Sequence, residues 1–241
     1  MKNNNINKKL YQSILVFLLA LVSITATSYA WFSLSKNTRV HSMSLEITTG
    51  YKLRIDTEAH SSIDDYYRDL QGTHIVNLSQ NTQLAPVTSA DGVSFFTEDG
   101  IGTNDTIGTY LEVPIHFRSL DAMNVHLSTK ALRTTANPTL VSGTNGIEKA
   151  IRISFTTNDS TKIYEPYGVS ANTFSLENSD EMVYNKSNAL FYIEKDVDLP
   201  VTMRIWLEGN DPDCTDVLRN ALYDIQLCFV GTDENYMPLD S

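Results

Sequence analysis

The sequence predicts an all-β protein: an antiparallel β-sandwich of jelly-roll or immunoglobulin-like type, preceded by an N-terminal apolar signal or anchor helix. Three observations lead to this prediction. Apolar and polar residues alternate along many short segments, turns rich in Gly, Asn and Pro separate these segments, and no helix-length pattern lies between them. Parallel strands need long crossover connections, usually helices, so an antiparallel arrangement is expected.

The expected strands follow one another from Met43 onward. Met43 to Ile47 and Leu53 to Ile55 alternate on either side of a Thr-Thr-Gly turn, which predicts a hairpin. Pro114 lacks a backbone N–H, so the strand that contains it is expected at a sheet edge or a bulge. Short helices are expected near residues 61–70 and 216–222. The remaining strands are expected at residues 73–78, 93–96, 110–117, 125–127, 151–155, 190–194, 201–207 and 223–229.

The first 30 residues have the layout of an export signal. Lys2, Lys8 and Lys9 precede an uncharged stretch, residues 10–32, whose centre is ILVFLLALVSI. Small residues at 28 and 30 predict cleavage by signal peptidase after Ala30, and the small residues at 26 and 28 offer a second possible site. An uncleaved membrane anchor is the alternative, because this stretch is long enough to span a bilayer. In both cases residues 31–241 are expected to form a single domain, extracellular or on the cell surface.

The charge of the chain argues against nucleic acid as a partner. The net charge is -11, and the first 30 residues hold three lysines and no acid, so the remainder carries -14. Such a body is repelled by phosphate backbones. The sequence also lacks the HExxH and GxSxG patterns and a glycine-rich phosphate loop. We therefore expect no enzymatic activity.

An acidic loop between residues 208 and 216 is the strongest local feature. Its carboxylates could hold calcium, a cation that prefers oxygen ligands; they belong to Glu208, Asp211, Asp213 and Asp216. The same residue types are also typical of a turn after a strand. Apart from calcium at this loop, no cofactor is expected.

The chain contains two cysteines, Cys214 and Cys228. An exported protein meets an oxidising environment, in which a disulfide between them can form. Two buried thiols are the alternative, and the spacing does not decide between the two states.

Three stretches together resemble secreted β-sandwich proteins of Gram-positive bacteria and, more loosely, the TasA and camelysin group of biofilm-matrix proteins. They are AWFS at residues 30–33, YLEVPIHFRSL at 110–120 leading into VHLS at 125–128, and IWLEG at 205–209 with DPDC at 211–214. The likeness is most specific at the signal junction and architectural elsewhere. Because the sequence has no zinc motif, the protease label of camelysin is not carried over.

The resemblance implies a structural protein that polymerises by passing its N-terminal strand into the sheet of the next subunit. The donor segment would run from residue 31 to 47, with apolar side chains from Trp31, Phe32, Leu34, Val40, Met43, Leu45 and Ile47. The alternative is that this segment pairs within its own domain.

Two functions are therefore expected. The first is a secreted or cell-surface structural protein of a matrix or fibre, with other copies or other surface proteins as partners. The second is a surface module that binds a carbohydrate or another ligand, for which solvent-facing tyrosines would supply contact area.

Overall fold

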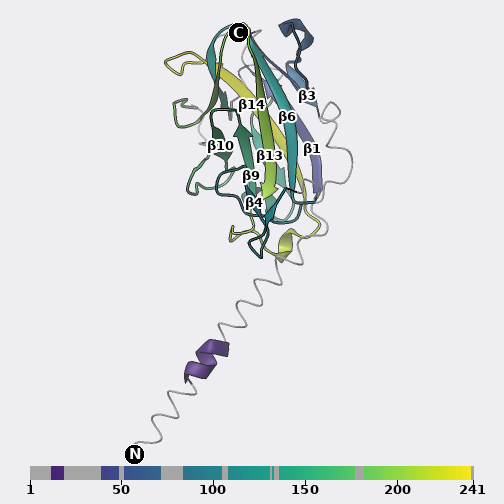
Figure 1. Cartoon of the computed structure of the whole chain (residues 1–241), viewed down its shortest axis with the longest axis vertical. Helices are drawn as coiled ribbons and strands as arrows, with labels where there is room; N and C mark the ends of the chain where they lie inside the picture. Colours follow the sequence, from purple (N-terminus) through teal and green to yellow (C-terminus); the bar gives the residue numbers. More distant parts are fainter. Residues whose placement is uncertain are drawn as a thin grey trace, which may run out of the picture.

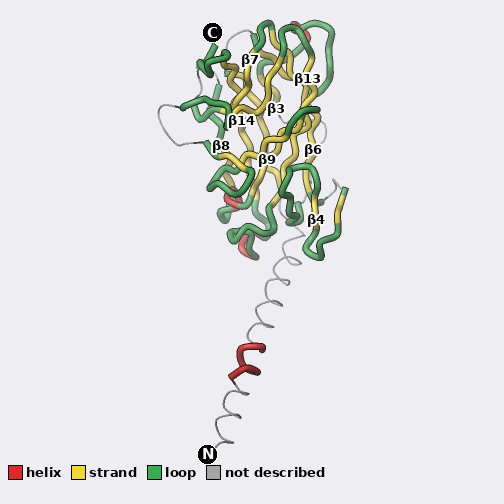
Figure 2. The backbone as a smooth tube through the Cα atoms, turned by 60° about the vertical axis from the view of Figure 1, so that its left-hand side comes forward, coloured by secondary structure: helices red, strands yellow, loops and turns green. Residues whose placement is uncertain are grey.

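The computed structural model describes residues 12–18, 39–48, 52–71, 84–104, 108–130, 132, 136–176 and 182–239. Residues 12–18 form a short helix, red in Figure 2. The rest of the expected signal or anchor segment lies outside the described residues, as do Trp31, Phe32 and Leu34. No helix in the described ranges is both long enough and apolar enough to cross a membrane.

The prediction of a β-rich chain is confirmed, because two six-stranded sheets make up most of the described fold (Figures 1 and 2). The first sheet contains β1 (Arg39–Ile47), β3 (Asp69–Gln71), β7 (Met123–Leu127), β8 (Leu140–Gly143), β12 (Ala189–Ile193) and β14 (Leu222–Thr232). Its order is β12-β7-β14-β1-β3, and β8 also pairs with β14.

The second sheet contains β2 (Leu53–Asp56), β6 (Tyr110–Ser119), β9 (Ile151–Thr156), β10 (Thr161–Tyr164), β11 (Thr173–Phe174) and β13 (Asp198–Leu207). Its order is β11-β10-β9-β13-β6-β2. A small two-stranded ribbon pairs β4 (Phe95–Phe96) with β5 (Gly102–Thr103). Three short 3-10 helices complete the described elements: η1 (Ile63–Asp65), η3 (Ile147–Lys149) and η4 (Asp216–Leu218).

The sheets are mixed, which corrects the prediction of a purely antiparallel fold. β1 pairs in parallel with β14 from Arg39↔Leu222 to Ile47↔Phe229, and β10 pairs in parallel with β11. No tight turn joins β1 to β14, because they come from opposite ends of the described chain. Alternation within each strand reveals its buried face, but it carries no information about the direction of a distant partner.

One hydrophobic core lies between the two sheets. Phe117 of β6 lies edge-on to Phe229 of β14 with ring centroids 5.2 Å apart, and it also contacts Phe191 of β12 at 4.9 Å. Phe155 of β9 meets Phe229 from the same side. Because these contacts join strands of different sheets, the sheets pack face to face. Each fully buried side chain of this size contributes roughly 1.5–3 kcal/mol through the hydrophobic effect.

The predicted hairpin between the first two strands is wrong. β1 pairs with β14 and β3 in the first sheet, whereas β2 pairs with β6 in the second. Leu45, Ile47, Leu53 and Ile55 are all fully buried. Both strands therefore place an apolar face in the same core, and the chain crosses from one sheet to the other instead of turning back.

Two other local predictions hold in part. Among the described strands, only β13 pairs with β6 at Pro114, because β2 reaches only residues 116–119, so the position of this proline agrees with the expectation in part. In the predicted helix at 61–70 only η1 forms. Ser62 caps it by accepting from the Asp64 N–H, and the backbone of Tyr67 then bonds to Ile55 of β2.

Polar groups on the outer face of the first sheet are also covered. His126 of β7 is fully buried; its Nδ1 lies 3.0 Å from Asn188 Oδ1 and its Nε2 lies 3.1 Å from Thr232 Oγ1. The Tyr184 ring lies edge-on to it at 5.2 Å. Burial lowers the pKa of His126, because the charged imidazolium is poorly solvated there.

This lowered pKa predicts that acid destabilises the protein through His126. Below the ordinary histidine pKa of about 6.5 the unfolded chain binds a proton that the folded chain resists, so the free energy of unfolding falls as the pH drops. His126→Gln is expected to flatten this dependence in denaturant unfolding at pH 7.5 and 5.5. His41→Gln, at an exposed histidine, is the control and should leave most of the dependence intact. An unchanged dependence in His126→Gln would contradict the assignment.

Candidate functional site

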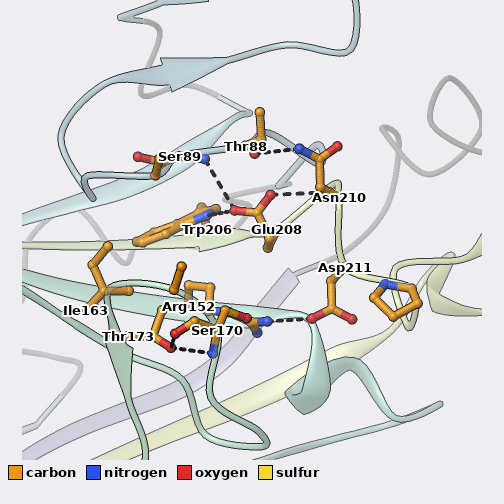
Figure 3. A pocket seen from close by; sticks show the side chains of 13 residues that line it. Thr88, Ser89, Arg152, Ile163, Ser170, Thr173, Trp206, Glu208, Asn210 and Asp211 are labelled. Atoms are coloured by element: carbon orange, nitrogen blue, oxygen red, sulfur yellow. Dashed lines mark hydrogen bonds and ion pairs between the residues drawn. The ribbon is translucent and has the colours of Figure 1, made fainter.

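A pocket of about 280 Å³ opens on the outer side of the second sheet (Figure 3). Arg152 of β9, Ile163 of β10 and Trp206 of β13 form its base, and segments 88–90, 170–173 and 208–212 form its walls. It is lined by Thr88, Ser89, Ala90, Arg152, Ile163, Ser170, Ala171, Thr173, Trp206, Glu208, Asn210, Asp211 and Pro212. The acidic loop identified in the sequence therefore contributes one wall.

A second, smaller apolar cluster supports the base of the pocket. Ile205 and Leu207 point into the main core, so Trp206 between them points to the opposite face of the sheet. Its indole lies edge-on to Phe95 at 5.3 Å, and Phe95 stacks on Tyr110 at 4.1 Å. The segment that carries Phe95 thus covers the outer face of the second sheet and keeps Trp206 buried beside the pocket.

Glu208 fixes the wall nearest to Trp206. Its Oε2 accepts hydrogen bonds from Trp206 Nε1 at 3.0 Å and from the Ser89 N–H at 3.2 Å. Its Oε1 accepts from the Asn210 N–H at 3.2 Å, and Asn210 Nδ2 donates to Thr88 Oγ1 at 3.0 Å. These bonds join two segments that are more than a hundred residues apart in the chain.

Arg152 is the buried cation of the site. Its side chain is 4% exposed, and its Nη2 donates to Glu165 Oε1 at 2.9 Å and to Asp211 Oδ2. Its Nη1 donates to the carbonyl oxygens of Lys149 at 2.7 Å and Ile151 at 2.9 Å. A buried guanidinium needs such complete pairing, because an unpaired buried charge is strongly destabilising.

The loop after Glu165 closes over that carboxylate. Glu165 Oε2 accepts from the Ser170 N–H at 2.9 Å and from Thr173 Oγ1 at 2.7 Å. Gly168 makes the turn with φ at +103°, and a Cβ there would lie 3.0 Å from Glu165 Oε1. Only glycine suits that backbone and that close approach. Figure 3 shows the result, with Glu208 on one side of the pocket and Arg152, Ser170 and Thr173 on the other.

The four acidic residues of the expected calcium site are not brought together. Glu208 and Asp211 line the pocket, while Asp213 lies 3.9 Å from Lys149 Nζ and Asp216 lies 3.6 Å from Arg219 Nη2. Across the described ranges, no three His, Cys, Asp or Glu side chains are grouped as metal ligands. The loop has the hydrogen bonds of a turn, because the Asp213 N–H donates to Asp211 Oδ1 at 2.8 Å.

The two cysteines are buried thiols in this structure, and no disulfide joins them. Cys214 follows the acidic loop, whereas Cys228 lies within β14, where its N–H donates to Thr139 Oγ1 at 2.9 Å. Burial, reinforced by the charges of Asp211 and Glu208, raises the pKa of the Cys214 thiol to about 12. Cys214 therefore stays protonated and poorly nucleophilic at neutral pH.

The described part of the expected donor segment is a strand of its own domain. Met43, Leu45 and Ile47 of β1 are buried in the main core, and Val40 packs against it. This is the pairing that the sequence left open as the alternative to donation. A β1 strand donated by another copy would have to replace this strand in the sheet.

Sequence reasoning missed Arg152, Glu165 and Trp206 as site residues. A usable signal existed for Arg152, a single charge in the run IRISF whose neighbours Ile151 and Ile153 are apolar. Glu165 had no comparable signal, because it meets Arg152 only after β9 and β10 pair. Trp206 could be placed on a strand, but the sequence does not reveal which segment covers its outward face.

The ion cluster predicts a large stability difference between two arginines of the second sheet. Arg152→Ala should lower the free energy of unfolding by about 3–5 kcal/mol, because Glu165 and Asp211 lose their buried partner. Arg204→Ala is the comparison: Arg204 is 15% exposed and pairs with Glu112, whose side chain is 37% exposed and can be solvated when the arginine is removed, so a smaller loss is expected. Equal losses of unfolding free energy for the two variants in urea would show that the Arg152 cluster contributes no more to stability than the Arg204–Glu112 pair.

Comparison of the chain with protein-family models, curated proteins and solved structures finds no match. The fold and the pocket geometry are therefore the basis on which a function is proposed.

Proposed function

We propose that the chain is a secreted or cell-surface structural protein, without enzymatic activity, that assembles into a matrix or fibre by donating β1 to a neighbouring copy. The observation that carries the proposal is the parallel pairing of β1 with β14. Its partners would be other copies or other surface proteins, and calcium remains a candidate ligand of the acidic loop. We also propose that the fold is a sandwich of jelly-roll or immunoglobulin-like type, and that the chain is similar to the TasA and camelysin group.

The position of β1 suits strand exchange. It lies between β14 and the three-residue strand β3, and no tight turn ties it to β14. A β1 strand from a second copy can make the same hydrogen bonds and fill the same core positions. Exchange of an identical element between copies needs no new interface, which makes it an accessible route to assembly.

The same contacts explain why a vacated site would need a replacement strand. Leu45 and Ile47 are fully buried, so removal of β1 exposes core side chains and the edge of β14. An open apolar edge of this kind pairs readily with another chain. Donation around a ring or along a line of copies would keep every sheet complete.

The strand-donation proposal predicts disulfides between chains at the β1–β14 junction. Ser42 and Asp224 are register partners there and Ser42 Oγ donates to Asp224 Oδ1, so cysteines at these two positions would lie side by side on adjacent strands. When the full chain with Ser42→Cys is refolded together with the full chain carrying Asp224→Cys, a mixed disulfide dimer is expected. Each single variant alone should give little dimer, and the unsubstituted chain controls for Cys214 and Cys228.

A chain that carries both substitutions distinguishes donation of β1 to another copy from pairing of β1 within its own chain. If β1 is donated, Ser42→Cys with Asp224→Cys should give chains linked in series, seen as ladders in non-reducing gels and as fibres by electron microscopy. Only internally bridged monomers, with no mixed dimer at high protein concentration, would rule out strand donation.

A second function, a surface module that binds a carbohydrate or another ligand, is favoured by the pocket beside Trp206. The pocket is concave, has an apolar base and carries several polar groups on its walls, which are the usual features of a small-ligand site. Ala171 lines it without taking part in the ion cluster, so Ala171→Phe should block it. A saccharide or other small molecule that binds the parent and fails to bind Ala171→Phe would support this function. Equal binding to both would place the ligand elsewhere.

A further inference from the structure

We infer that this pocket selects a primary ammonium group on an aliphatic stem, such as the side chain of a lysine. This inference rests on the ligand-binding function proposed above and names the chemical class of the ligand. It is independent of strand donation, because β1 contributes no residue to the pocket.

The charge of the pocket favours a cation. Glu165, Asp211 and Glu208 bring three carboxylates to the site, and Arg152 brings one guanidinium. Arg152 already donates to two carboxylates and two carbonyl oxygens. An anionic ligand would therefore meet an excess of negative charge and a cation whose four terminal N–H groups are occupied, whereas an ammonium group gains from the same field.

The walls retain acceptors for such a group. A carboxylate offers about four acceptor positions. Glu208 uses three of its positions, for Trp206, Ser89 and Asn210, and Asp211 uses two, for Arg152 and Asp213. An ammonium has three donors and no acceptor, so it complements a wall of this composition.

The base and the size of the pocket fit an aliphatic stem. Ile163 and Pro212 supply apolar surface beside the carboxylates, and the fully buried Trp206 supports them from below. The volume of about 280 Å³ lies just below the range of about 300–1,000 Å³ that is usual for drug-sized ligands. A single side chain or a small amine therefore suits the pocket better than a polysaccharide segment.

The surface beside the pocket suggests that the ammonium belongs to a larger molecule. Tyr167 is 47% exposed and Val169 is 69% exposed in the loop that leads directly to Ser170 and Ala171. Exposed apolar side chains next to a pocket are available for contact with a protein surface. A lysine within a peptide should accordingly bind more tightly than a free alkylamine.

The test is calorimetric titration of the full chain with Nα-acetyl-lysine methylamide, with its norleucine counterpart as the uncharged probe and pentylamine as the free amine. The lysine probe should bind, and the norleucine probe should bind at least about tenfold more weakly. Glu208→Gln should weaken the lysine probe by about tenfold, and Ala171→Phe should abolish its binding. Glu98→Gln is the matched control: it removes the same charge from an exposed residue outside the pocket and should change nothing.

The outcomes distinguish failure of the ammonium inference from failure of the ligand-binding function. Equal binding of the lysine and norleucine probes, or equal weakening in Glu208→Gln and Glu98→Gln, would overturn the ammonium inference. A neutral sugar that binds the parent and not Ala171→Phe, without binding of the lysine probe, would overturn it too but keep the ligand-binding function. Failure of every probe, with all variants folded by circular dichroism, would overturn both.

Discussion

The structure depends most on β14, the strand that holds three neighbours at once. It pairs with β7, β8 and β1, and its inward face presents Phe229 to Phe117 and Phe155 of the second sheet. Gly231 leaves room for the side chain of Met123 on the neighbouring strand β7, because a Cβ there would lie 2.3 Å from Met123 Sδ. β14 is thus both the centre of one sheet and a main contact of the core.

This arrangement links the two ends of the domain. β14 is the longest partner of β1, so β1 can complete its sheet only after β14 has been made. Pairing between distant segments is slow to form, since loop closure must precede the stabilising contacts. During that time β14 presents an edge that the β1 of any copy can occupy, which connects the topology to the proposed assembly.

The pocket has a different physical basis, because it is built on the outer face of the second sheet. The segment that carries Phe95 shields the apolar base of the pocket from solvent. The buried charges of the pocket are stabilised by pairing with one another. Arg152 and its carboxylates are buried, and buried pairs of this kind often contribute little net stability compared with apolar residues. These buried pairs instead fix one geometry of the pocket, in which the carboxylates of Glu208 and Asp211 face the same small volume.

The sequence by itself determined the strands and their buried faces. Runs such as Val201 to Leu207 and Tyr223 to Phe229 alternate so regularly that they identify the face turned toward the main core, and the structure buries that face. It also located the acidic loop, because that loop is a local pattern. Tertiary structure alone decided that β1 and β2 lie in different sheets, that β1 runs parallel to β14, and that Arg152 meets Glu165 and Asp211. These features depend on which distant segments pair, and alternation along one strand is compatible with many partners and both directions.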